Sequence, residues 1–528
     1  MLGNANMTRM RTLSMDGHSL RLDDLAAFLA GEVRVSAAPA ALERVRRCAD
    51  VCAGIARSDV PHYGINTGFG KFARVRVSAE DEVELQHNLL RSHATASGPP
   101  LERDIVRLMM VLRANSLLAG FSGASVELVT RILDLVDRDI TPVVPCYGSV
   151  GASGDLAPLA HLSLALIGEG EVVHRGHQVS ARDALAAEKL EALPLRPKEG
   201  LALINGTQLM SAYAARELLR ARRLLATSMG AAAMSLEAYQ ATDRVFDARL
   251  HALKPHPGQV RIAEGFRRLH EGSDIIKSHR DCDRVQDPYS FRCIPQVLGA
   301  VDDTLAWIET WVIREINAVT DNPIVFPDDG DVISGGNFHG QHMAIALDAL
   351  AIAACEIASI AERRVDKLME GDGERVPRCL IQNPGFNSGF MIAQYLAAAL
   401  VSENKIHAHP ASVDTIPTSL GFEDHVSMGS ISALKLARLL DNVTRVVAVE
   451  LLCAAQAIDF HTPHAPGQGT KAVHAAVRVI VPFIERDTSL TPYLARLEAA
   501  ANSGEILAAV EKAIGPLLPH STVPGEIP

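Results

Sequence analysis

Residues 340–370 constrain the fold of this chain most, because they combine an apolar helical pattern with many small side chains. Large apolar residues recur at helical spacing: Ile345, Leu347, Leu350, Ile352, Ile357 and Ile360. Alanines fill much of the remaining surface, and small side chains let neighbouring helices approach closely. A helix that is apolar nearly all round must be buried among other helices. This segment therefore predicts a thick central bundle with interfaces to other copies of the chain.

The composition of the whole chain supports the same interpretation. Of its 528 residues, 48% are apolar but only 4% are aromatic, so most of the apolar residues are Ala, Leu, Val and Ile. Alanine and leucine are strong helix formers. The sequence therefore predicts a mainly α fold. The expected long helices span residues 207–241, 297–319, 340–370, 388–404 and 430–459.

The N-terminal part is more mixed. Residues 20–22 are predicted as a strand that leads into a helix capped near Asp23. Apolar spacing predicts two or more helices between residues 80 and 137 and another over 155–167. A strand-and-loop insertion is expected over residues 170–200, and residues 1–12 are expected to form a loose extension.

Charge and cysteine use exclude several classes of function. The net charge of −11 comes from 62 acidic and 51 basic residues without a basic stripe, so no nucleic acid partner is expected. None of the eight cysteines forms a Cys-x-x-Cys pair, which predicts reduced thiols and no metal site, including at Cys48 and Cys52. No signal peptide and no uncharged apolar window of about 20 residues is visible. A soluble cytoplasmic protein without a membrane partner is expected.

The run Gly-Ser-Val-Gly-Ala-Ser-Gly-Asp-Leu-Ala-Pro-Leu-Ala-His at residues 148–161 carries the strongest chemical signal. Small residues around Ser153 leave the backbone free to fold back on itself. If the Gly154 nitrogen attacks the Ala152 carbonyl and water is lost, a 4-methylidene-imidazol-5-one (MIO) ring forms. This ring is an electrophile, which no ordinary side chain provides. The alternative is a glycine-rich turn that opens a helix and cradles phosphate.

Two further segments offer groups for amine elimination. Tyr63 lies in Tyr-Gly-Ile-Asn-Thr-Gly-Phe-Gly, a glycine-flanked loop at residues 63–70 that could close over a site as a lid. A phenol acts as a base only where its anion is stabilised. Arg292, in Gln-Asp-Pro-Tyr-Ser-Phe-Arg-Cys, has the planar fork that binds a carboxylate through two hydrogen bonds. A surface turn and an ordinary ion pair are the alternatives for these two residues.

Together these motifs resemble the MIO-dependent ammonia-lyases and aminomutases of aromatic amino acids, and the resemblance covers roughly residues 15–515. It implies that Ala152, Ser153 and Gly154 form the MIO group, that no external cofactor is needed, and that Tyr63 is the catalytic base. It implies a carboxylate-binding role for Arg292. The other implied site residues are Gln286 and Tyr289, which line the site, Phe338, which packs by the ring, and Asn205, which bonds the MIO oxygen or the substrate carboxylate. An N-cap at the start of a helix is the alternative role for Asn205.

Two positions address the choice of substrate. The pair Ser92-His93 is similar to that of histidine ammonia-lyases, although some tyrosine lyases and aminomutases share it. Glu423, in Glu-Asp-His-Val-Ser-Met, also follows the histidine lyases. A carboxylate suits an imidazole ring, whereas opposite a phenyl ring it would be a buried unpaired charge. Phe422 departs from the polar residue usual at that position, which leaves either a pocket wall or a core position open.

The resemblance is strongest to the histidine ammonia-lyases, and it implies conversion of L-histidine to trans-urocanate and ammonia. It also implies the mainly α histidine ammonia-lyase/fumarase-like fold and a homotetramer whose sites combine residues of several subunits. The expected domains are an MIO-bearing domain over 13–206 and a helical bundle with a C-terminal helical region over 207–528. The alternatives are a tyrosine or phenylalanine ammonia-lyase or aminomutase with the same group, and a non-catalytic helical assembly protein.

Overall fold

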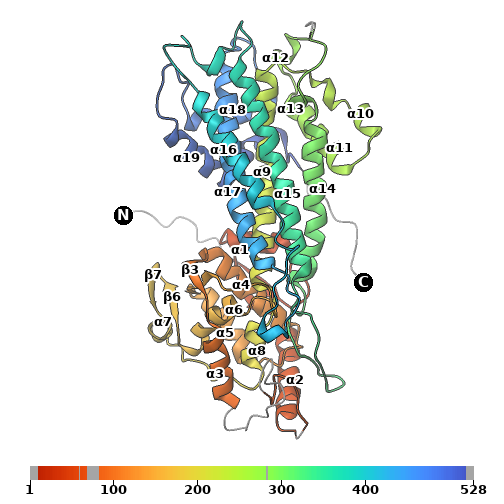
Figure 1. The fold of residues 1–528 in the computed structure, drawn as a ribbon, viewed down its shortest axis with the longest axis vertical. Coiled ribbons are helices and arrows are strands. Elements are labelled where there is room, and N and C mark those ends of the chain that lie inside the picture. Colours follow the sequence, from red (N-terminus) through yellow and green to blue (C-terminus); the bar gives the residue numbers. More distant parts are fainter. Residues whose placement is uncertain (1–9, 59, 68–81, 281–283, 519–528) are drawn as a thin grey trace. The chain divides into compact units, whose positions relative to one another are not determined.

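The computed structural model describes residues 10–58, 60–67, 82–280 and 284–518. The chain divides into two compact units. Unit 1 comprises Met1–Arg216, Thr310–Leu347 and Ala411–Leu434; unit 2 comprises Glu217–Glu309, Asp348–Pro410 and Lys435–Pro528. Helices dominate both units, which confirms the predicted mainly α fold (Figure 1). The predicted domain boundary at residue 206 stays a prediction.

Unit 1 begins with two parallel strands, β1 (Arg11–Met15) and β2 (Val33–Ala37). Helix α1 (Leu22–Leu29) connects them, so the predicted strand at residues 20–22 is wrong. The Asp24 carboxylate accepts a hydrogen bond from the Arg21 N–H at 3.1 Å, which favours a first helical turn at this point. Residues 1–9 of the predicted extension lie outside the described residues, and its last two residues belong to β1.

Helices form the core of unit 1. Helix α4 (Arg103–Leu118) is buried along most of its length and packs against α5 (Val126–Asp137) and α2 (Pro39–Ala56). A second group packs α6 (Leu156–Leu164) against α3 (Glu82–His93) and α8 (Glu199–Ile204). These helices confirm the two helical regions predicted from apolar spacing in the N-terminal part.

Short strands complete unit 1. Strands β4 (Ile140–Pro142), β6 (Glu171–His174) and β7 (His177–Ser180) form an antiparallel sheet in the order β4-β6-β7. This sheet confirms the predicted strands after residue 170, but α7 (Ala181–Ala187) makes the insertion partly helical. The remaining elements are the strand pairs β3 (Ser97–Pro100) with β5 (Pro145–Tyr147) and β8 (Ile324–Phe326) with β9 (Asp331–Ile333), and the 3-10 helices η2 (Ala165–Ile167) and η5 (Ser419–Gly421).

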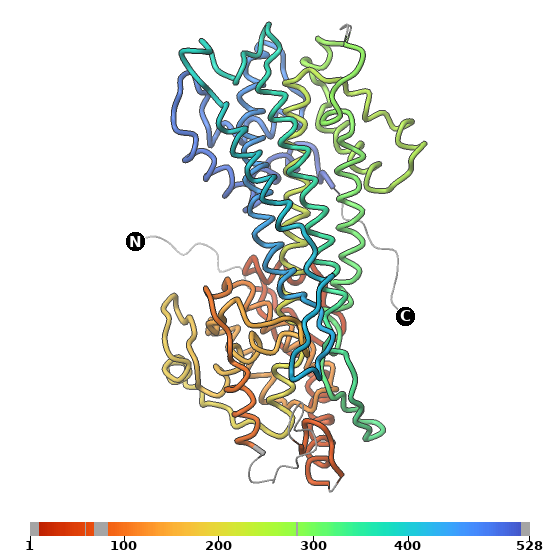
Figure 2. Tube along the Cα trace, viewed as in Figure 1, coloured from red at the N-terminus to blue at the C-terminus, as the bar shows by residue number. Residues whose placement is uncertain are grey.

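Five long helices dominate the chain after residue 207, as the apolar spacing predicted. They are α9 (Gln208–Ala238), α14 (Ile294–Ile316), α15 (Gln341–Glu370), α16 (Met391–Ala408) and α17 (Gly429–Asp459). Within unit 2 these helices run alongside one another (Figure 2). Hydrogen bonds join neighbours directly, such as Ser235 of α9 with Glu450 of α17 and Gln394 of α16 with Glu362 of α15.

Shorter helices surround these long ones in unit 2. Helix α18 (Gln468–Ile480) packs against α20 (Glu505–Ile514), α11 (Pro257–Leu269) and α19 (Thr491–Ser503). The other shorter elements are η3 (Asp243–Phe246), α10 (Ala248–Ala252), α12 (Asp274–Lys277), α13 (Tyr289–Arg292) and η4 (Arg378–Leu380). The predicted segment around Arg292 therefore folds as the four-residue helix α13, directly before α14.

Helix α15 is the one helix of the described chain that is long and apolar enough to cross a membrane by length and composition. Of its most apolar window, 67% is buried inside the structure. Burial against neighbouring helices explains this apolar character without a lipid environment. The helix therefore behaves as the core element that its alanine-rich pattern predicted.

The seven described cysteines are free thiols, and Cys282 lies outside the described residues. Burial raises the pKa of Cys48 to about 11 and that of Cys52 to about 12, so both thiols stay protonated near neutral pH. Both belong to an apolar cluster with Ile65 and Val325. Within the described ranges, no group of three or more potential side-chain ligands could hold a metal ion.

Candidate active site

The Ala152-Ser153-Gly154 segment forms a tight turn of unit 1, between β5 and α6. Ser153 and Gly154 both have positive φ angles, +50° and +78°. Two consecutive left-handed residues turn the chain sharply, and this conformation is costly for a residue other than glycine. A Cβ atom at position 154 would collide with the backbone of Gly206, so this close approach requires glycine there.

A buried carboxylate fixes the far side of this turn. Asp155 Oδ2 accepts hydrogen bonds from the backbone N–H groups of Leu209 and Met210, at 3.0 and 3.1 Å, in the first turn of α9. The Asp155 N–H donates in turn to the Gly206 carbonyl at 2.7 Å. Burial raises the pKa of Asp155 to about 7, although its hydrogen bonds favour the charged form. Both the side chain and the backbone N–H of Asp155 therefore hold the turn against the start of α9.

The other side of the turn is tied to the start of α17. The Met428 N–H donates to the Val150 carbonyl at 3.0 Å, and the Ser430 hydroxyl donates to the Ser149 carbonyl at 2.7 Å. Gly151 has φ +80° and lies against Ser427, so a side chain would not fit there. These contacts bring together residues about 280 positions apart in the sequence. The resemblance assigns the motifs at 148–161 and 423–428 to one active site, so it requires them to lie close together.

Glu423 contacts the reactive serine directly. The Ser153 hydroxyl donates to Glu423 Oε1 at 2.7 Å, and the Thr418 hydroxyl donates to Oε2 at 2.9 Å. Thr418 and Glu423 are also joined by backbone hydrogen bonds, which fix the short loop that carries the carboxylate. The neighbouring Phe422 is 66% exposed, which excludes a core position for it within this chain.

His93 lies close enough to Glu423 for the two to interact electrostatically. It is the last residue of α3, and its Nδ1 lies 2.9 Å from the Leu89 carbonyl and 3.1 Å from the Ser92 hydroxyl. Burial lowers the pKa of His93, while the Leu89 carbonyl and the Glu423 charge favour its protonated form. The two residues that sequence linked to an imidazole substrate therefore lie near one another.

Asn205 is the C-cap of α8 and does not cap the start of α9, so the N-cap alternative is wrong. Its side-chain Nδ2 donates to the backbone carbonyl of Asn322 at 3.0 Å. The backbone carbonyl of Asn205 accepts a hydrogen bond from the buried guanidinium of Arg113 at 3.0 Å. Within the described chain, its buried Oδ1 has no hydrogen-bond partner. Because a buried polar atom without a partner is costly, this atom is available to a ligand.

Phe338 and Tyr63 also belong to unit 1. The residue after Phe338, His339, stacks on His425 with ring centroids 5.9 Å apart, which brings the Phe338 turn to the segment that contains Glu423. Tyr63 lies in a turn and is partly buried. The loop motif that starts at Tyr63 is described only as far as Thr67, so its last three residues lie outside the described chain.

The predicted carboxylate-binding residue Arg292 belongs to unit 2, together with the predicted lining residues Gln286 and Tyr289. Tyr289 and Arg292 are the first and last residues of α13, and Gln286 precedes it. The Arg292 guanidinium lies over the Tyr289 ring, 4.4 Å from its centroid. Among the described residues, the buried Arg292 Nε has no hydrogen-bond partner. An arginine with an unused buried donor is suited to binding a carboxylate.

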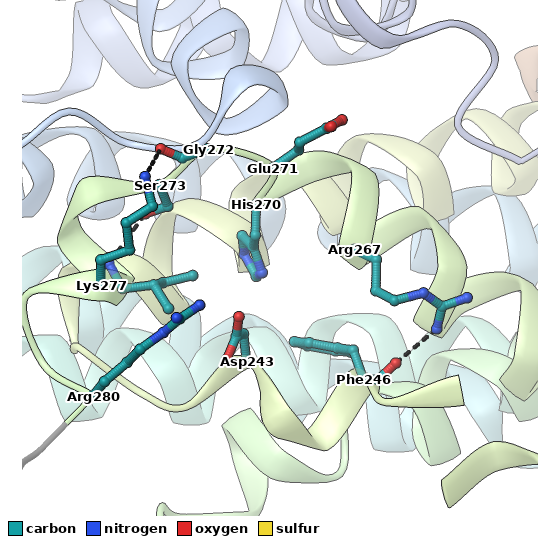
Figure 3. Close-up of a pocket in the computed structure, with 10 residues that line it drawn as sticks. Asp243, Phe246, Arg267, His270, Glu271, Gly272, Ser273, Lys277 and Arg280 are labelled. Atoms are coloured by element: carbon teal, nitrogen blue, oxygen red, sulfur yellow. Dashed lines mark hydrogen bonds between the residues drawn. The ribbon is translucent and has the colours of Figure 1, made fainter. Parts of the chain in front are cut away.

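Unit 2 also contains a pocket of about 210 Å³ that the candidate active site does not use. Figure 3 shows His270 and Asp243 facing one another across it, with Lys277 and Arg280 on one side. The His270 ring packs against Phe246 and Phe266, with centroids 5.7 Å apart in both pairs. The aromatic packing explains the position of this histidine in the core, and side chains of both charges line the pocket.

Residues other than the predicted ones shape the site. Asp155 holds the reactive turn in place. Thr418 does the same for Glu423, and Arg113 does the same for Asn205. Asp155 lies inside the motif at residues 148–161, and Thr418 lies five residues before Glu423, so their proximity to the site could have been predicted. Arg113 lies in the middle of α4 without any local motif, and only the folded structure connects it to Asn205.

Comparison with known proteins identifies the family of this chain. The sequence matches the family described as aromatic amino acid lyase over residues 20–479. It is 47% identical over 506 residues to histidine ammonia-lyase of Gloeobacter violaceus, which covers 96% of this chain and 98% of that protein. The crystal structure of histidine ammonia-lyase from Trypanosoma cruzi matches with a TM-score of 0.89 and 38% identity over 98% of this chain and 99% of that one.

A tyrosine aminomutase is also structurally similar. The enzyme from Streptomyces globisporus matches with a TM-score of 0.90 and 34% identity, covering 96% of this chain and all of that one. Fold and site thus define an enzyme that breaks carbon–nitrogen bonds of amino acids. The chain belongs to the aromatic amino acid lyase family, and it is a carbon–nitrogen lyase.

Proposed function

We propose that this chain eliminates ammonia from L-histidine to give trans-urocanate, with an MIO group formed from Ala152, Ser153 and Gly154. Full-length relatives that carry the name histidine ammonia-lyase support this substrate. The observation that carries the proposal is the Glu423 carboxylate, which lies 2.7 Å from the Ser153 hydroxyl. A carboxylate beside the reacting group suits an imidazole N–H and would be costly beside a phenyl ring.

The residues of the turn fit the group that they are proposed to form. Gly154 is required by the close backbone of Gly206, and the positive φ angles of Ser153 and Gly154 already curl the chain. The anchoring of Asp155 on α9 restricts the turn to few conformations, which favours a reaction of the chain with itself. When formed, the MIO group supplies an electrophile that activates the substrate amine as a leaving group.

Each remaining residue has a proposed role toward L-histidine. Tyr63 accepts the proton from the β-carbon. Arg292 binds the carboxylate, Asn205 supports the carboxylate end, and Glu423 with His93 binds the imidazole ring. Phe338 packs by the MIO ring. Gln286 and Tyr289 line the site beside Arg292. The resemblance to the family supports a homotetramer whose active sites combine residues of several copies. We place the enzyme in the cytoplasm, as a soluble protein.

A panel of substrates tests the proposal. The purified enzyme is incubated with L-histidine, L-tyrosine and L-phenylalanine, and acrylate products are followed by their ultraviolet absorbance. We expect urocanate from L-histidine at a kcat/KM that exceeds the values for the other two substrates. A preference for L-tyrosine or L-phenylalanine would contradict the proposed substrate. The Ser153→Ala variant, which lacks the hydroxyl, serves as the matched blank.

A second candidate is an aminomutase with the same group. The similarity to the Streptomyces globisporus tyrosine aminomutase and the Ser92-His93 pair favour this alternative. An aminomutase would move the amine, by adding the group released from the α-carbon to the β-carbon. The reaction mixtures are therefore also analysed for β-amino acids by chromatography, and a β-amino acid as main product would identify a mutase.

A further inference from the structure

Helix α13 carries two proposed active-site residues but has only four residues of its own. A helix this short has almost no internal hydrogen bonds, so its position depends on contacts with its surroundings. Tyr289 at its first position is 70% exposed, whereas Phe291 is fully buried. The placement of Arg292 therefore depends on what holds α13 from its buried side.

A fully buried ion pair lies on that side. Arg364 of α15 donates from Nε to Glu450 Oε1 at 2.5 Å and from Nη2 to Oε2 at 2.9 Å. Neither side chain is exposed to solvent. The Ser235 hydroxyl of α9 donates to the same Glu450 Oε1 at 2.7 Å. Three helices of unit 2 thus fix the guanidinium of Arg364 in one orientation.

The remaining terminal nitrogen of Arg364 faces α13. Arg364 Nη1 donates to the Ser290 carbonyl at 3.4 Å. Ser290 lies between Tyr289 and Arg292, inside α13. Carbonyl groups at the end of a short helix lack partners within it, and a charged donor is a strong one for them. One arginine therefore connects the bundle to the backbone that carries Arg292.

Two other contacts hold the α13 segment, on either side of the hydrogen bond from Arg364 to Ser290. The Phe291 ring stacks on Tyr239 with centroids 4.5 Å apart, and Asp287 Oδ2 accepts from the Thr242 N–H at 2.8 Å. These contacts hold the segment near α9 and η3. The Arg364 bond acts on the Ser290 carbonyl, between Tyr289 and Arg292, so it restrains α13 at a different point from these two contacts.

We propose that Arg364, oriented by Glu450, is a positioning residue that aligns Arg292 with the substrate carboxylate. Removing two charges from water costs as much as their attraction returns, so a buried ion pair seldom stabilises a fold more than apolar residues would. A role in placing α13 gives this pair a function beyond stability. The inference rests on the proposed role of Arg292 as the carboxylate-binding residue.

The test removes the whole pair, because deleting one partner would leave a buried unpaired charge. The double variant Arg364→Met/Glu450→Leu replaces it with apolar side chains of similar size. The Arg363→Met variant is the control, because this neighbouring side chain is 57% exposed and pairs with Glu362 on its own helix. Circular dichroism and thermal melting show whether each variant is folded. The conservative variant Arg364→Lys, which keeps a charge opposite Glu450, is measured in parallel.

The readout compares ligands with and without a carboxylate. Imidazolepropionate and histamine are used as inhibitors, beside the KM and kcat for L-histidine. In the double variant we expect KM and the inhibition constant of imidazolepropionate to rise by about tenfold, as for a misplaced binding group. The inhibition constant of histamine should change by less than about twofold, and Arg363→Met should match the wild type.

Two results would overturn the proposal. An equal loss of affinity for both inhibitors would indicate general distortion, and wild-type constants for both would show that Arg364 does not position Arg292. The Arg292→Met variant tests separately whether Arg292 binds the carboxylate. If this variant also keeps its affinity for imidazolepropionate, the proposed role of Arg292 itself fails. If the double variant does not fold, the same comparison on Arg364→Lys decides, with a selective loss of carboxylate affinity expected.

Discussion

At the scale of single residues, the contact between Ser153 and Glu423 distinguishes this site. Both the hydroxyl and the carboxylate were singled out by sequence, but their separation of 270 positions gave no measure of their distance. The structure brings them within a hydrogen bond, and Thr418 fixes the second carboxylate oxygen. The carboxylate is thereby directed at the reacting group by neighbours that leave it little freedom.

The charge of Glu423 should matter for L-histidine in particular. We expect Glu423→Gln to reduce kcat/KM for L-histidine by about 5- to 12-fold, because a charge-assisted hydrogen bond of ~1.5–3 kcal/mol becomes a neutral one of ~0.5–1.5 kcal/mol. The amide keeps the size of the side chain, so the fold should be unaffected. Steady-state kinetics measure the effect, with Asp424→Asn as the control on the neighbouring exposed carboxylate. Unchanged kinetics for L-histidine would exclude Glu423 from imidazole binding.

Sequence singled out candidate site residues where a motif is continuous along the chain. The turn at residues 152–154, Tyr63 and Arg292 each lie in such a motif, although their roles stay predictions. Asn205 was harder, because an asparagine after an apolar stretch suits either end of a helix. The contact of Arg113 with Asn205 could not be predicted, because no sequence pattern indicates which residue a buried arginine in a helix will contact.

At the scale of elements, helix positions followed from apolar spacing, and all five predicted long helices were confirmed within a few residues. The predicted strand at residues 20–22 failed because alternation over three residues is too short to outweigh a capping carboxylate at Asp24. The helix α7 inside the predicted strand-and-loop insertion was missed, although Ser180 caps it by accepting a hydrogen bond from the Asp183 N–H.

The junction between α9, α12 and α18 should respond to pH through Glu237. This buried carboxylate accepts from the Ser273 hydroxyl at 2.7 Å and from the Gly467 N–H at 3.1 Å. Burial raises its pKa from 4.5 to about 7. The folded state therefore holds a proton that the unfolded state has released, and the stability from this group is lost as pH rises from about 4.5 to 7.

Glu237→Gln should remove this dependence on pH, because the amide does not ionise. Relative to the wild type, we expect the stability of the variant to increase between pH 5 and pH 8, by about 1.4 kcal/mol for each unit of the pKa shift lost. Thermal melting at several pH values measures this difference. Parallel stability curves for the two proteins over that range would contradict a neutral carboxyl group at this junction.

At the scale of the whole molecule, the proposed site residues are distributed over both units of the chain. Tyr63, Ser153 and Glu423 belong to unit 1, whereas Gln286, Tyr289 and Arg292 belong to unit 2. Sequence could predict that these residues act together only through resemblance to a family, because spacing along one chain does not show which copy supplies each residue. The oligomer is therefore the part of the account that most needs a direct experiment.

Mixed oligomers supply that experiment. Tyr63→Phe and Arg292→Met should each be nearly inactive alone. If sites combine residues of different copies, co-expression of the two variants should restore roughly a quarter of the wild-type activity, because some sites then receive both intact residues. Light scattering should show a tetramer for each protein. Co-expressed variants that stay inactive while forming mixed tetramers would place each complete site within one copy.

The intact mass of the purified chain tests the central claim most directly. Cyclisation of residues 152–154 followed by dehydration removes two water molecules from the encoded polypeptide. We predict that the wild-type mass is lower than the encoded mass by two waters, while Ser153→Ala, which has no hydroxyl to lose, does not show this loss. A wild-type protein that eliminates ammonia from L-histidine at its full encoded mass would contradict the account.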